Sequence, residues 1–204
     1  MEIKRLVAII WKRIWLFFGI IITISVSTAI FTFTQTPIYE TEVRFIVSPS
    51  NILLNDIGNL RSAVTSLDTP VVANTYAEIS QSPSIVGKAW KQLGISPQTG
   101  YEVNSSVLQE TTIVTIVVSG PDPELSHQLA NAISDQALSY VRGLTTVYDL
   151  TLLDPSTLPG RPSKPNNLFN LVLGFTIGIM AAVLATIMAE YLISPIENAA
   201  TDRS

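Results

Sequence analysis

Hydrophobic residues gather in two long uncharged runs, one near each end of the chain. Ile14 to Phe33 contains 20 residues without a charge, and Asn166 to Ala189 contains 24. At about 1.5 Å of rise per residue, a helix of either length crosses the ~30 Å hydrocarbon layer of a membrane. The sequence therefore predicts transmembrane helices over residues 14–33 and 166–193.

Charge next to the first run predicts the orientation of both helices. The residues before it carry four positive charges against one negative charge: Lys4, Arg5, Lys12 and Arg13 against Glu2. The positive-inside rule then predicts that residues 1–13 and the tail 194–204 are cytoplasmic, and that residues 34–165 form an extracytoplasmic domain. The alternative is a cleaved signal peptide that ends at Ser27-Thr28-Ala29, but the apolar run is long for one.

The region between the spans alternates between strand and helix periods. Residues 39–47 (YETEVRFIV) place every second residue on one apolar face, which predicts a half-buried strand. Further strands are predicted at 101–108, at 113–119, which is apolar enough to be central, and at 147–153, with a hairpin through 109–111. Helices are predicted from Thr69, from Ser82 to Gly94 and from Asp122 to Leu144. The pattern gives a loop at 48–59 and no clear assignment at 61–66. It predicts an α/β domain of the α+β kind between two transmembrane helices.

Residues 154–165 form a proline-rich connector before the second span. Its prolines are Pro155, Pro159, Pro162 and Pro165. Each lacks an amide donor and fixes φ, so a helix or a central strand is excluded and an extended polyproline-type rod is predicted. The rod would be a stiff strut that positions the domain, with Arg161 and Lys164 near lipid headgroups. The alternative is a structureless linker.

Composition excludes several classes of function. Of the 204 residues, 14% are charged and 47% are apolar, and residues 34–165 carry seven basic and twelve acidic residues, so no basic surface favours nucleic acid. The absence of cysteine excludes disulfides, thiol nucleophiles and cysteine metal sites. A single histidine makes a zinc site improbable, and no acid/base pair or hydrolase motif is evident. We expect no enzymatic activity, no cofactor and no metal.

Taken in order, these features resemble the Wzz-type chain-length determinants, or polysaccharide co-polymerases. The chain has a basic N-terminus before a first span, then the strand YETEVRFIV, then the helix segment GPDPELSHQLANAISDQALSYV, which is similar to the family's D-P-x-x-A and A-N-A pattern. A proline-rich segment then enters a glycine-containing second span. Without a long helical insertion or a GxxxxGK[ST] motif, the chain is similar to the short, stand-alone branch that lacks a kinase domain.

The resemblance implies a non-enzymatic membrane scaffold that assembles as a homo-oligomer. It would control the chain length or export of a capsule, exopolysaccharide or O-antigen, together with a polysaccharide polymerase and the export machinery. The alternative is a two-span sensory or adaptor protein that activates a separate cytoplasmic tyrosine kinase. A membrane-anchored glycan enzyme is a third reading, which the lack of catalytic residues opposes. The sequence does not identify the sugar or the number of subunits.

A few residues are candidates for particular roles. In the second span, Gly174, Gly178, Ala182 and Thr186 recur every four residues and predict close packing against the first span or a neighbouring subunit. Glu40, Glu42 and Arg44 alternate on the polar face of the first strand, either as a subunit interface or as screened surface charges. His127 falls off the apolar stripe of its helix, which predicts a surface position. Trp90 and Tyr140 could stack on sugars, but their place on apolar stripes favours the core.

Overall fold

The computed structural model describes residues 10–49, 69–144 and 148–201. The chain divides into two compact units, Pro37–Lys164 and the paired terminal segments Met1–Thr36 and Pro165–Ser204. The predicted loop beyond residue 49 and the unassigned segment 61–66 lie outside the described residues.

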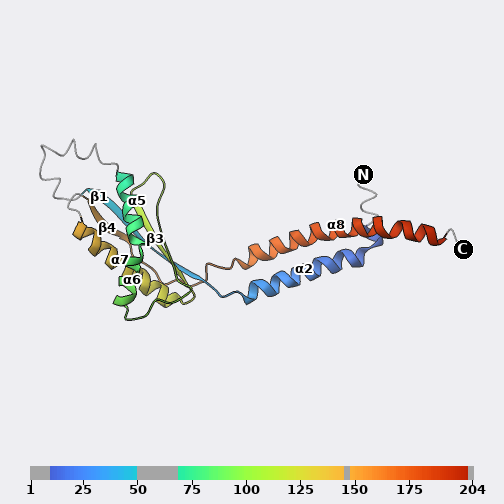
Figure 1. Ribbon diagram of the computed structural model, residues 1–204, viewed down its shortest axis with the longest axis horizontal. Helices are drawn as coiled ribbons and strands as arrows, with labels where there is room; N and C mark the ends of the chain where they lie inside the picture. The colour runs from blue at the N-terminus through green and yellow to red at the C-terminus, as the bar shows by residue number, and fades with distance from the viewer. Residues whose placement is uncertain (1–9, 50–68, 145–147, 202–204) are drawn as a thin grey trace. The chain divides into compact units, whose positions relative to one another are not determined.

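Within the described residues, four antiparallel strands form one sheet in the order β2-β3-β1-β4 (Figure 1). The central strand β1 pairs with β3 along its first eight residues and with β4 along its second half. The predicted hairpin through 109–111 joins β2 to β3, with Glu110 at a φ of 59° in the turn. The strands are β1 (Tyr39–Pro49), β2 (Glu102–Val107), β3 (Ile113–Gly120) and β4 (Tyr148–Asp154).

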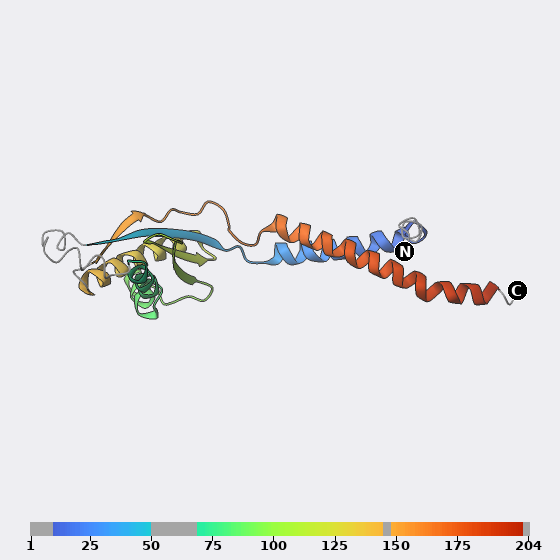
Figure 2. The ribbon, with the colours of Figure 1, turned by 90° about the horizontal axis from the view of Figure 1, so that it is seen from above.

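Three helices cover one face of this sheet: α5 (Thr69–Ser80), α6 (Pro83–Gln92) and α7 (Pro123–Leu144) (Figure 2). The predicted starts of α6 and α7 are confirmed. The Ser82 hydroxyl accepts the amide of Ile85 at 3.4 Å, and Asp122 Oδ1 accepts the amide of Glu124 at 2.9 Å. These side chains satisfy donors that the first turn leaves unpaired.

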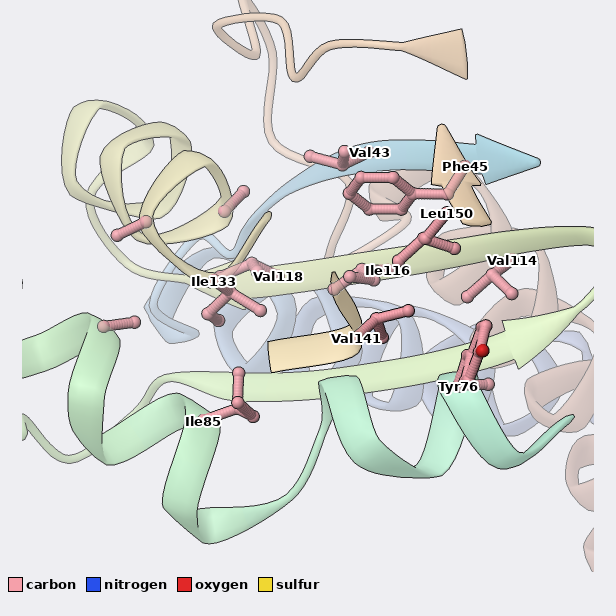
Figure 3. Close-up of a cluster of buried hydrophobic side chains, with 14 of the residues drawn as sticks. Val43, Phe45, Tyr76, Ile85, Val114, Ile116, Val118, Ile133, Val141 and Leu150 are labelled. Atoms are coloured by element: carbon pink, nitrogen blue, oxygen red, sulfur yellow. The ribbon is translucent and has the colours of Figure 1, made fainter. Parts of the chain in front are cut away.

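The hydrophobic core lies between the sheet and the helices, and the alternation of β1 determines its sheet side. Val43 and Phe45 are fully buried while their neighbours Glu42 and Arg44 are exposed, as predicted. Figure 3 shows these side chains facing Ile133 and Val141 of α7, with Tyr76 and Ile85 coming from α5 and α6. The domain is therefore a two-layer α+β fold.

The second unit contains two long apolar helices, α2 (Ile14–Thr34) and α8 (Asn167–Thr201). All of α2 and the Asn167–Leu192 part of α8 are long and apolar enough to cross a membrane, judged by length and composition. Both helices begin within a residue of the predicted starts, and α8 continues into the predicted tail as far as Thr201.

Candidate functional site

The connector between β4 and α8 is attached to the domain at both of its ends. Residues 155–164, called the strap below, run back along β1. Near the beginning of the strap, Thr41 Oγ1 donates to the carbonyl of Thr157 at 2.8 Å. At its end the amide of Ile38 donates to the carbonyl of Lys164 at 2.9 Å, and the amide of Ser163 donates to the carbonyl of Ile38 at 2.8 Å.

These bonds show that the strap lies along the first half of β1, beyond the point where β4 stops pairing with it. Pro155 and Pro162 are exposed and Pro159 is half-buried, while Pro165 belongs to the helical unit. The strap is therefore bound along the domain instead of standing free of it. Its role as a positioning strut stays a prediction.

A buried serine fastens the strap to α7. Ser156 is only 8% exposed, and its hydroxyl donates to Asn131 Oδ1 at 2.7 Å. The same hydroxyl lies 2.8 Å from His127 Nδ1, so a proton on Nδ1 lets the ring donate to Ser156. Asn131 Nδ2 is 3.4 Å from His127 Nε2, which can accept from it in that tautomer. His127 is thus half-buried in a hydrogen-bonded cluster, whereas the sequence predicted a surface position and none of these partners.

The charged residues predicted on β1 pair within the same domain. Glu40 Oε1 lies 2.9 Å from the ammonium of Lys164, and this hydrogen bond and charge raise the pKa of Lys164 above its usual value. Arg44 lies 2.7 Å from Glu42 and 3.9 Å from Asp154. All members of the Arg44 cluster are substantially exposed, so each pair contributes little to stability. A role for Glu40, Glu42 and Arg44 in a subunit interface stays a prediction.

The small residues of α8 face α2. Gly174, Gly178, Ala182 and Thr186 are all buried, the last two completely. A Cβ on Gly174 would come within 2.7 Å of the Thr28 Cβ, and a Cβ on Gly178 within 3.5 Å of the Ile21 Cα. The two backbones therefore approach closely along this face, as small residues permit.

The helix pair is joined at one end by ion pairs. Glu190 on α8 lies 3.2 Å from the ammonium of Lys12 and 3.1 Å from Nε of Arg13, just before α2. The pattern of apolar residues gave no role to Glu190. In the sequence, Glu190 is the first charged residue after Lys164. It lies at the end of α8 that antiparallel pairing of the two helices places beside the basic segment before α2.

The two aromatic candidates have different surroundings. Trp90 is buried and packs edge-to-face on Tyr101 with ring centroids 5.4 Å apart, so its predicted core position is confirmed. Tyr140 is 41% exposed, and its predicted core position is wrong. The buried residues of α7 include Ala137 and Val141, and Tyr140 lies at the margin of this buried stripe. Across the part of the chain that the structure describes, no three His, Cys, Asp or Glu side chains form a metal-binding group.

Comparison with known proteins finds one family model that matches residues 1–93, described as Wzz, chain length determinant protein. Over 191 residues the chain is 29% identical to the capsular polysaccharide biosynthesis protein CpsC of Streptococcus agalactiae, covering 92% of this chain and 80% of that protein. It is 26% identical over 209 residues to the probable capsular polysaccharide biosynthesis protein YwqC of Bacillus subtilis, covering 97% of this chain and 80% of that protein.

A solved structure has a similar fold. The full-length bacterial polysaccharide co-polymerase matches with a TM-score of 0.50 at 10% sequence identity, over 95% of this chain and 99% of that chain. At that identity the match concerns the fold alone. It extends over both the α+β domain and the two apolar helices.

Proposed function

We propose that the chain, which is similar to the Wzz-type chain-length determinants, controls the chain length or export of a surface polysaccharide as a non-enzymatic membrane scaffold. Capsule is the favoured polymer, because the related CpsC and YwqC proteins are described by capsular polysaccharide biosynthesis.

One observation carries the proposal. The similarity to CpsC extends over 92% of this chain, so it is not confined to an apolar helix or to the domain alone. A shared module such as an apolar helix would give a short local match. Agreement along nearly the whole chain instead supports a common architecture used for a common task.

The proposed topology has two membrane spans, α2 and the Asn167–Leu192 part of α8, with both termini in the cytoplasm and the domain outside. The protein would assemble as a homo-oligomer and act beside a polysaccharide polymerase and the export machinery. Control through the geometry of an oligomer agrees with a strap that is hydrogen-bonded to β1 and α7.

Deleting the gene tests the proposed function. The length distribution or the amount of surface polysaccharide should change, and the wild-type gene supplied in trans should restore both. If length and amount stay unchanged in the deletion strain, the proposal fails. Phosphorylation of a cytoplasmic kinase that responds to the protein while the polymer is unaltered would favour the adaptor alternative.

A further inference from the structure

The exposed tyrosine of α7 lies where three helices meet. Tyr140 lines a hollow of about 310 Å³ together with residues of α5, the α5–α6 junction and the start of α6. It also lines a second hollow of about 320 Å³, between α6 and α7. Each volume lies at the lower end of the range for small-molecule sites. One aromatic side chain is thus shared by two adjacent hollows.

The polar groups around Tyr140 are available to a ligand. The Lys88 ammonium lies 5.7 Å from the centre of the Tyr140 ring, an arrangement that cation–π attraction favours. No carboxylate among the described residues pairs with Lys88. The hydroxyls of Ser84 and Ser139 likewise make no hydrogen bond to any described residue, and both side chains are exposed.

Other polar side chains that line the two hollows have hydrogen-bond partners within the domain. Nearby polar groups such as Thr75 and Gln136 already use their side chains, Thr75 on the carbonyl of Val71 and Gln136 on the side chain of Gln92. Lys88, Ser84 and Ser139 offer donors and acceptors around an aromatic face. A partly exposed tyrosine has an apolar ring and a polar tip, which suits a ligand that is itself apolar on one face and hydroxylated at its edges.

We infer that the two hollows around Tyr140 form a binding site for a glycan, with a sugar ring against the tyrosine and its hydroxyl or acidic groups bonded by Lys88, Ser84 and Ser139. The inference rests on the proposed function, because the polysaccharide that the chain controls is the glycan this site would hold. Lys88 reaches the ring on a flexible stem, so it can move aside and still donate to the bound sugar. The site would let the scaffold touch the growing polymer itself.

Binding is measured with the full-length protein in detergent micelles. The probe is surface polysaccharide from the strain that carries the gene, cut to short oligosaccharides, with dextran oligosaccharides of equal size as the comparison. Tyr140→Ala should weaken binding of the probe about threefold to tenfold, because a stacked aromatic contact contributes on this scale. Tyr140→Phe should retain most of the affinity, since it retains the ring.

Matched controls separate the site from general effects. Lys88→Ala should weaken binding, while Lys91→Ala, an exposed lysine three residues further along α6, should not. Leu108→Ala removes an exposed apolar side chain on the β2–β3 hairpin, away from the two hollows, and should also leave binding unchanged. Because Tyr140 is exposed, its truncation should leave the melting of the domain near the wild-type value.

The outcomes separate this inference from the proposed function. If wild-type protein does not bind the oligosaccharides, or all variants bind equally, the glycan site is refuted. When the gene deletion still alters polymer length in that case, the proposed function stands without the site. If Tyr140→Ala instead lowers the mass of the oligomer, the surface is an interface between copies, which also refutes the glycan site. If binding depends on Tyr140 but deleting the gene leaves the polymer unchanged, the glycan site is supported and length control is refuted.

Discussion

Replacing Gly174 with alanine should separate α8 from α2 locally. The added Cβ would lie 2.5 Å from Oγ1, 2.6 Å from Cγ2 and 2.7 Å from Cβ of Thr28. Rotation of the threonine side chain cannot relieve the last contact, because Cβ does not move with χ1. The Thr28 hydroxyl is also held by the carbonyl of Ile24 at 2.9 Å. The helices must therefore shift, and overpacking of this kind costs about 1–3 kcal/mol.

The assay is the free energy of unfolding of the full chain, measured by SDS titration in mixed micelles. Gly19→Ala is the matched control, since a Cβ on Gly19 of α2 meets nothing within 4 Å. That variant reports the helix propensity gained from alanine without a steric conflict, so it should be neutral or stabilising. If Gly174→Ala is as stable as Gly19→Ala, the close approach of the two helices at Thr28 is refuted.

Three further predictions concern the strap. Ser156→Ala should lower the stability of the domain by about 1–2 kcal/mol, because Asn131 and His127 lose their shared partner. Hydrogen exchange of the strap amides tests this prediction. The control is Thr157→Ala, which changes an exposed side chain of the strap. Replacing Pro159, Pro162 and Pro165 with glycine should leave the domain folded but alter polysaccharide length, and an unaltered length would make the stiffness incidental. The pKa of Lys164 is raised in the folded protein by Glu40. The stability that this ion pair contributes is therefore fully present below the usual lysine pKa and is lost as pH rises through the higher folded value. An NMR titration of Lys164 that shows no upward shift would contradict this.

Local signals in the sequence account for much of the fold. The alternation in residues 39–47 correctly predicted β1 and its buried face, and the serine and aspartate caps correctly predicted where α6 and α7 begin. The resemblance to the Wzz-type family, carried by the order of these elements, is confirmed. Such signals work because periodicity and caps depend on residues that are neighbours in the sequence.

Contacts between distant segments could not be predicted in the same way. His127 and Asn131 lie four residues apart on α7, but nothing local indicates that Ser156 completes their cluster. The apolar stripe of α7 is wider than the surface that the sheet covers. Tyr140 lies at the margin of that stripe and is therefore exposed. No local signal predicts the ion pairs of Glu190, because its partners come from the opposite end of the chain.

Graded expression tests length control most directly. The gene would be returned to its deletion strain under an inducible promoter, and the molar mass distribution of the surface polysaccharide measured at each protein level by size-exclusion chromatography with light scattering. Length control predicts that the distribution shifts progressively from that of the deletion strain to that of the wild type as the protein accumulates. A distribution that is the same at every level, including none, would contradict the central claim.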